Sequence, residues 1–148
     1  MAHHYPLQLN WTGNTLDGTY NRNATVTTPG KHKLAVSSAP EYAGDAACWN
    51  PEDLLGSALA TCHMLTFLAL CAKAKVAIVG YEDHAESVLD TVDKVTRVTQ
   101  VHLRPVIRVT RGTSMAQVVE LFEKAHKYCF VANSITCEAV LAPRVVEV

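Results

Sequence analysis

The sequence predicts an α+β fold in which antiparallel sheets surround a long buried central helix and a second helix. Three observations predict it: short strand-like segments fill the first 38 residues, a long apolar stretch follows, and a β-rich hairpin then precedes a segment with helical periodicity. The chain has 148 residues, of which 49% are hydrophobic and 18% charged. This is enough apolar material for one compact core, so we assign residues 1–148 to a single domain.

The N-terminal part reads as an antiparallel sheet. Segments 24–28 and 33–37 have strand character, and turn residues such as Asp17-Gly18 and Pro29-Gly30 separate the strands.

A helix is predicted to begin after Asn50. Asn50 is a favourable cap, Pro51 suits the first helical position, and Glu52 and Asp53 favour the positive end of the helix dipole. The body of the helix, residues 54–72, is apolar nearly all round, which fits either a membrane span or a buried central helix. Polar and small residues within it, among them Gly56 and Thr61, favour a buried helix in a globular protein. Because so short a chain cannot bury every side of this helix, we expect a partner subunit to cover the remaining surface. We therefore expect no membrane association.

The second half of the chain predicts a long β-hairpin, a helix and a β-rich tail. Segments 82–89 and 95–110 contain alternating and β-branched residues, and a polar turn at 90–94 separates the two segments. Ser114 and Gln117 form a capping box, after which an apolar stripe predicts a helix that ends at Cys129. The tail, 135–148, is interrupted by Pro143 and is expected to close a sheet edge. The residues of the helical stripe are Val118, Phe122, Ala125 and Cys129.

Composition narrows the possible functions. Thirteen basic and fourteen acidic residues give a formal net charge of −1, and no basic stripe forms, so nucleic acid is not an expected partner. Residues 1–10 lack the pattern of a secretory signal, and we expect a cytoplasmic protein. Five cysteines without regular spacing indicate reduced thiols and, if they are functional, redox or nucleophilic chemistry.

Cys62 and Cys129 are the candidate reactive residues, although each alone is more typical of a buried structural thiol. Cys62 lies about three turns beyond the start of its helix, where the helix dipole no longer supports an anion. A reactive Cys62 therefore needs another positive group.

The motifs around both cysteines resemble the OsmC/Ohr superfamily of osmotically inducible and organic hydroperoxide resistance proteins. The first motif is Asn-Pro-Glu-Asp-Leu-Leu at 50–55 followed by Ala-Thr-Cys at 60–62. The second is Ala-His-Lys-Tyr-Cys at 125–129 followed by Ala-Asn-Ser at 132–134. The order of predicted elements along nearly the whole chain also matches that family, which implies its fold.

The resemblance implies a thiol-dependent hydroperoxide reductase that acts in antioxidant defence. Cys62 would attack the peroxide and become a sulfenic acid, and Cys129 would convert it to a disulfide that an external dithiol, such as a lipoyl group, reopens. Arg22 would supply the positive charge at Cys62, paired with Glu52. A hydrophobic organic hydroperoxide is the expected substrate, and no separate cofactor is expected.

Glu52 and Cys62 are ten residues apart on one helix, or about 15 Å along its axis, so Glu52 cannot reach its own Cys62. We therefore predict an intertwined homodimer with active sites at the subunit interface. Its central helices would pack antiparallel and bring Glu52 of one subunit to Arg22 and Cys62 of the other.

Two residues depart from the better-known peroxidase branches. His63 follows the first cysteine, where an apolar or aromatic residue is commoner, and Phe130 follows the second in place of proline. The chain looks more like a less characterised branch with a Cys-His-Met-Leu motif. Two alternative functions stay open: a Cys/His metal site that includes His126, and a non-catalytic protein that binds a small hydrophobic ligand. The three remaining cysteines are interpreted as structural: Cys48, Cys71 and Cys137.

Overall fold

The structure is a computed structural model that describes residues 1–148. The chain forms two compact units, Met1–Leu54 and Leu55–Val148. We call them the N-terminal unit and the C-terminal unit. The assignment of the whole chain to one domain stays a prediction.

The N-terminal unit contains the antiparallel sheet that the sequence predicts. Its strands are β1 (Gln8–Asn10), β2 (Ala24–Thr27) and β3 (Leu34–Val36), in the order β1-β2-β3, and a short helix, η1 (Pro40–Tyr42), follows. Ser37 is the one buried residue in this unit, and most of its large apolar side chains are exposed, including Tyr5 at 86% and Leu7 at 68%. This unit therefore has no apolar core of its own.

The long helix α1 (Pro51–Lys73) begins where the capping residues place it. The Asp53 N–H donates to Asn50 Oδ1 at 2.8 Å, and the Asn50 N–H donates to Asp53 Oδ2 at 3.1 Å. These reciprocal bonds satisfy main-chain donors that the first turn would otherwise leave unpaired. The predicted start of the helix is confirmed.

Only one side of α1 is covered within the chain. Its buried residues recur at spacings of three and four and form one stripe along the helix. The residues on the opposite side are exposed, and Leu65 among them is 57% exposed. The single chain therefore covers one side of the helix, and the expectation that a partner subunit covers the other side stays a prediction. The buried stripe is Gly56, Leu59, His63, Phe67 and Cys71; the exposed stripe is Ala58, Thr61, Leu65, Ala69 and Ala72.

By length and composition, α1 is also the one helix that could cross a membrane. Its most apolar window has a mean hydropathy of 1.8, and 28% of that window is buried. A helix in the core of a globular protein is also apolar all round when one of its sides packs on a sheet and the other side packs on another helix or strand.

The predicted hairpin is present, but each of its arms is interrupted. β5 (Glu86–Val92) and β6 (Val95–Leu103) pair around Asp93 and Lys94, both of which have positive φ angles, as tight hairpin turns require. The outer parts of the arms, β4 (Ile78–Asp83) and β7 (Pro105–Val109), pair in a separate sheet. The sequence did not predict this division, because apolar and polar residues alternate both before and after the point where the arms divide.

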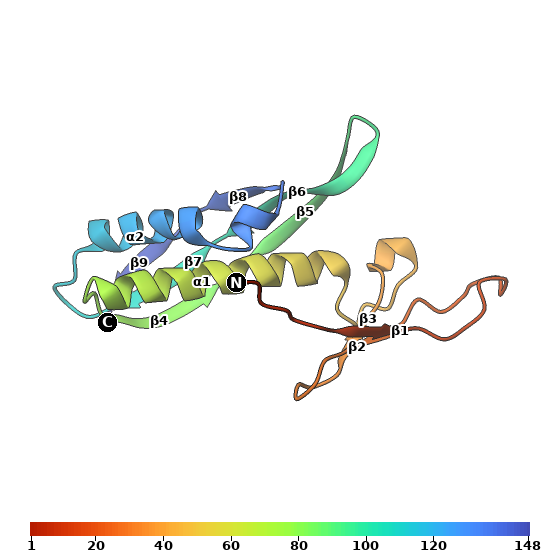
Figure 1. Ribbon diagram of the computed structural model, residues 1–148. Helices are drawn as coiled ribbons and strands as arrows, with labels where there is room; N and C mark the ends of the chain where they lie inside the picture. Colours follow the sequence, from red (N-terminus) through yellow and green to blue (C-terminus); the bar gives the residue numbers. More distant parts are fainter. The chain divides into compact units, whose positions relative to one another are not determined.

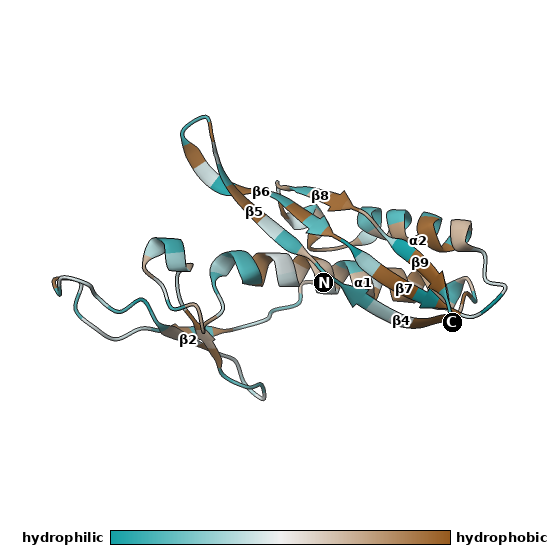
Figure 2. Cartoon of the chain, turned by 180° about the vertical axis from the view of Figure 1, so that it is seen from behind, coloured by the Kyte–Doolittle hydropathy of each residue, from teal (hydrophilic) through white to brown (hydrophobic).

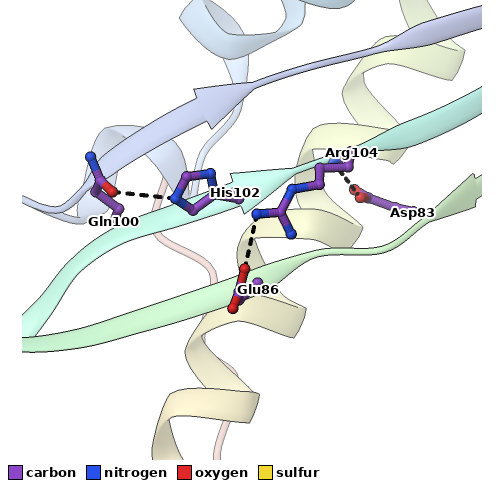
Figure 3. Close-up of polar contacts among 5 residues, drawn as sticks. All are labelled: Asp83, Glu86, Gln100, His102 and Arg104. Carbon is purple, nitrogen blue, oxygen red and sulfur yellow. Dashed lines mark hydrogen bonds and ion pairs between the residues drawn. The ribbon is translucent and has the colours of Figure 1, made fainter.

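Polar contacts fix the point where the arms divide (Figure 3). The Arg104 N–H donates to Asp83 Oδ1 at 2.7 Å, and the Arg104 guanidinium donates to Glu86 Oε2 at 2.9 Å. One residue thus holds the end of β4 and the start of β5. On the neighbouring part of β6, His102 Nε2 lies 3.2 Å from Gln100 Oε1.

The C-terminal unit continues with α2 (Met115–Tyr128), η2 (Ala132–Ser134), β8 (Glu138–Leu141) and β9 (Arg144–Glu147). The predicted cap of α2 is confirmed, since the Gln117 N–H donates to Ser114 Oγ at 3.2 Å. β8 and β9 form sheet edges, as predicted, but they run parallel to β6 and β7. The two sheets of this unit are therefore mixed, and the prediction of purely antiparallel sheets is wrong for them.

Both helices of the C-terminal unit lie on the same face of its strands (Figures 1 and 2). In Figure 2, which views the chain from behind, the strands lie in front of the helices and carry much of the hydrophobic colouring. The core forms where the helices meet the strands, around Phe67 of α1 and Phe122 of α2, whose ring centroids are 5.6 Å apart. Cys129 belongs to this core and Cys62 packs against it.

Candidate active site

Cys62 lies in the middle of α1, on the flank between its buried and exposed stripes. It is one position before the buried His63 and one after the exposed Thr61, and successive helical residues are about 100° apart. The side chain is accordingly half-buried.

Cys129 follows the last residue of α2 as its C-cap, with an extended backbone at φ −69° and ψ 116°. It continues the predicted stripe, and all four residues of that stripe are fully buried. The thiols of Cys129 and Cys62 interact, and this interaction lowers the pKa of Cys62 and raises that of Cys129. The structure therefore brings together the two cysteines that the sequence analysis paired.

Hydrogen bonds favour the ionised form of Cys62. Burial raises the pKa of this thiol, but bonds from the Val131 main chain and from the Cys129 side chain act against burial. The Phe130 main chain and the Thr66 hydroxyl add to them, and the pKa of Cys62 lies below its ordinary value of 9.0 as a result. The Thr66 hydroxyl also donates to the Cys62 carbonyl at 2.8 Å, so its single proton serves one of these acceptors at a time.

The pKa of Cys129 moves in the opposite direction. Burial raises it, and the Ala132 N–H, 3.5 Å from the sulfur, offsets only part of this effect. Negative charge on Cys62 raises the pKa of Cys129 further. The pair therefore consists of an accessible sulfur that ionises more easily and a buried sulfur that keeps its proton and donates it.

The turn after α2 is held by its own hydrogen bonds. The Asn133 N–H donates to the Cys129 carbonyl at 3.1 Å, and the Ser134 N–H donates to the Val131 carbonyl at 2.9 Å. The Ser134 hydroxyl donates to the Phe130 carbonyl at 2.7 Å. These bonds hold the turn whose Ala132 N–H donates to the Cys129 sulfur.

A pair of histidines lies in the neighbouring core. His63 is fully buried, with its ring 4.4 Å from that of Phe122 and 6.1 Å from that of His126, measured between centroids. Neither ring nitrogen of His63 has a hydrogen-bond partner, and the same is true of His126 Nδ1. Burial, with a smaller effect of His126, lowers the pKa of His63 from 6.5 to about 4, so this ring is neutral at pH 7.

No group of three or more His, Cys, Asp and Glu side chains is arranged to hold a metal ion. The geometry therefore gives the Cys/His metal alternative no support.

Arg22 and Glu52, the other two predicted catalytic residues, belong to the N-terminal unit. The Arg22 guanidinium lies 4.1 Å above the Tyr20 ring and donates from Nη1 to the Tyr20 carbonyl at 2.8 Å. Glu52 lies in the first turn of α1 and is partly buried. The pairing of these two residues, and their place at Cys62, stay predictions.

The remaining cysteines differ in their surroundings. Cys71 is buried in the core, and burial raises its pKa to about 11, which fits an inert structural thiol. Cys137 is partly buried, packs against the core and directly precedes β8. Cys48 is partly buried in the N-terminal unit.

Thr66 and the main chain of the turn, which also affect the pKa of Cys62, were not among the residues predicted from the sequence. Thr66 could have been found, since it lies four residues after Cys62 and therefore on the same side of the helix. The main chain of Phe130 and Val131 could not have been found in this way, because nearly all residues have a main-chain N–H group and only the path of the turn brings these two residues near Cys62.

Comparisons with known proteins agree with this architecture. The family model described as OsmC-like protein matches residues 44–142. The protein YmaD of Bacillus subtilis is 25% identical over 137 residues, which cover 90% of this chain and 87% of that protein. An OsmC-like protein of unknown function from Vibrio cholerae has a similar structure, with a TM-score of 0.87 and 29% identity over 96% of this chain and 99% of that one.

An organic hydroperoxide resistance protein from Elizabethkingia anophelis shares the fold, with a TM-score of 0.72 and 19% identity over the full length of both chains. The matched family model covers both cysteine motifs and more than half of the chain. The chain belongs to the family of OsmC-like proteins.

Proposed function

We propose that this protein is a thiol-dependent reductase of organic hydroperoxides. The observation that carries the proposal is the interacting pair Cys62 and Cys129, in which the half-buried cysteine has the lowered pKa and the buried one the raised pKa. A peroxidatic thiol must be ionised and reachable, and a resolving thiol must wait close by with its proton in place.

The proposed cycle has three steps. The Cys62 thiolate attacks the terminal oxygen of the hydroperoxide, the O–O bond breaks, and the alkoxide that leaves takes a proton from water to become an alcohol. Cys62 is then a sulfenic acid, and the Cys129 thiol attacks its sulfur and releases water as the disulfide forms. An external dithiol, for which a lipoyl group is our proposal, reduces the disulfide to two thiols and is itself oxidised.

A homodimer is the second part of the proposal. Its support comes from two surfaces that the chain leaves uncovered: the exposed apolar stripe of α1, and the N-terminal unit without a core. A second copy that packs on both would remove this apolar surface from water. In that dimer, Glu52 and Arg22 would complete the site at Cys62; a guanidinium has five N–H donors, so the contact of Arg22 with Tyr20 leaves others for the partner.

The dimer is tested by Leu65→Asp, which places a charge in the middle of the exposed stripe. We expect this variant to sediment as a monomer, or to form a weaker dimer that is already dissociated at protein concentrations at which the wild type is still dimeric. Glu120→Gln, on the exposed side of α2, is the control and should leave the mass unchanged. Equal masses for the wild type and Leu65→Asp at all concentrations would exclude this interface.

The reaction is tested by turnover of cumene hydroperoxide with dihydrolipoamide. Cys62→Ser should abolish turnover, whereas Cys129→Ser should allow one reduction per subunit and accumulate the sulfenic acid. Arg22→Ala and Glu52→Gln should slow the attack step. Cys71→Ser, which alters a cysteine outside the pair, should keep the wild-type rate, and an unchanged rate in Cys62→Ser would exclude the proposal.

One observation favours the alternative of a binding protein without catalysis. A groove of about 540 Å³ is lined by residues of α1 and α2, among them the apolar Leu70 and Leu121 and the basic Lys73 and Lys124. Such a groove suits an apolar molecule with an acidic end. Tight binding of a fatty acid together with no peroxide turnover in any variant would favour this alternative.

A further inference from the structure

The groove that α1 and α2 line lies on the same flank of α1 as Cys62. Successive helical residues are about 100° apart, so residues three and four positions apart share one side of a helix. Cys62, Thr66, Leu70 and Lys73 follow one another at intervals of four, four and three. Leu70 and Lys73 line the groove, so the row of side chains that begins at Cys62 continues into it.

The side of α2 that faces this groove ends next to the second cysteine. α1 and α2 lie side by side (Figure 1), and the ring centroids of His63 and His126 are 6.1 Å apart. The α2 residues that line the groove are Leu121, Lys124 and Tyr128. Tyr128 directly precedes Cys129, so on this helix too the groove residues are continuous with a cysteine of the pair.

The lining of the groove combines apolar and basic side chains and contains no acidic one. Its charged residues are Lys73 and Lys124, both of which are exposed. Neither takes part in the ion pairs of the chain, which involve His84, Arg104 and Arg108. Two ammonium groups without a carboxylate partner, beside apolar surface, favour a ligand that has an anionic end and a hydrocarbon body.

A small molecule suits this groove better than a second copy of the chain. Its volume of about 540 Å³ lies within the range of small-molecule sites. Lysine is depleted in the cores of protein–protein interfaces, whereas it is a good partner for an anion at a surface. None of the groove residues belongs to the exposed stripe of α1 that the proposed dimer covers.

We propose that Lys73 and Lys124 bind the anionic end of an amphipathic hydroperoxide whose hydrocarbon chain lies along the groove toward Cys62. The proposal deepens the proposed function, since it rests on Cys62 being the sulfur that reacts, and it makes the two lysines residues that determine specificity. Lys73 lies eleven residues after Cys62, or about 16 Å along the helix axis. A substrate that reaches both must be long, whereas the compact, uncharged cumene hydroperoxide needs neither lysine.

The substrate test compares linoleic acid hydroperoxide with its methyl ester, which has the same chain without the charge. We expect the wild type to prefer the acid. The double variant Lys73→Gln/Lys124→Gln should lose about tenfold in kcat/KM for the acid, which two exposed charge contacts together can provide, and little for the ester. The loss should appear in KM with kcat unchanged, because the anionic end is bound equally before and during the reaction.

Two controls accompany this comparison. Lys73→Arg/Lys124→Arg keeps both charges and should keep the preference for the acid. Lys94→Gln removes an exposed lysine of the hairpin turn, outside the groove, and should keep the wild-type rates. An acid-to-ester ratio of kcat/KM that is equal in the wild type and the double variant would overturn the proposal.

A direct binding measurement does not depend on turnover. Linoleic acid has the same anionic end and no peroxide group, and titration calorimetry below its micelle concentration gives its dissociation constant. We expect the double variant to bind it about tenfold more weakly than the wild type does. This difference should shrink at high salt, which screens exposed charges. Equal dissociation constants at low salt would also overturn the proposal.

These readouts separate the inference from the proposed function. Weaker binding of linoleic acid to the double variant, without turnover of any hydroperoxide, would keep the lysine site and exclude the reductase. Turnover of cumene hydroperoxide with an unchanged acid-to-ester ratio would keep the reductase and exclude the lysine site.

Discussion

Acid is expected to destabilise this protein through His63. The ring is fully buried, and both of its nitrogens lack a hydrogen-bond partner, so the native state strongly prefers the neutral form. The unfolded chain takes up a proton at this residue near pH 6.5, whereas the folded chain does so only at about pH 4. Between these values the unfolded state binds more protons, and stability therefore falls as the pH falls.

The size of the effect follows from the shift in pKa. A decrease from 6.5 to about 4 corresponds to about 3 kcal/mol of unfolding free energy, since each unit is about 1.4 kcal/mol. This contribution is complete above about pH 7, is lost progressively between pH 6.5 and 4, and changes no further below pH 4.

The assay is urea unfolding of the wild type and of His63→Leu from pH 8 to pH 4 at a fixed protein concentration. Leucine has a similar volume, no polar atoms and no titratable group. At pH 8 the variant should be as stable as the wild type or more stable, because an unpaired buried polar ring is replaced by an apolar side chain. At pH 4 the difference in favour of the variant should be larger by about 3 kcal/mol.

The control is His84→Gln, which removes an exposed histidine that lies 3.0 Å from Glu82. It should keep the pH dependence of the wild type. Parallel stability curves for the wild type and His63→Leu would refute the reasoning, because they would mean that His63 takes up its proton at the same pH in the folded and unfolded chains.

Three further predictions concern the local contacts described above. Cys62 should be alkylated first at pH 7 and Cys71 last, because burial raises the pKa of Cys71 to about 11; mass spectrometry checks this, and early labelling of Cys71 in the folded protein would contradict it. Asn50→Ala should lower the unfolding free energy by about 1 kcal/mol in urea titrations, since it removes the side-chain acceptor of the Asp53 N–H, whereas Asn50→Asp should keep most of that stability. Arg104→Ala should cost less than about 1 kcal/mol, because its ion pair with Glu86 is exposed and its N–H still reaches Asp83; a loss above 2 kcal/mol would show that the guanidinium has a structural role.

The sequence by itself determined the elements and the two cysteines. The start of α1 follows from the side chains of Asn50 and Asp53, and the stripe of α2 that ends at Cys129 follows from helical periodicity. Both are local properties, which residues a few positions apart in the chain decide. The motifs around Cys62 and Cys129 then indicated the family that the comparisons confirm.

The tertiary structure decided which groups surround these elements. Parallel pairing of β8 and β9, and the division of the hairpin arms at Arg104, depend on contacts between distant segments, about which alternation of apolar residues says nothing. The same holds for the site. The need of Cys62 for a positive group could be read from its position in the helix, but Cys129 and the main chain that follows it, which lower the pKa of Cys62, lie almost seventy residues later, and only the folded path of the chain brings them to Cys62.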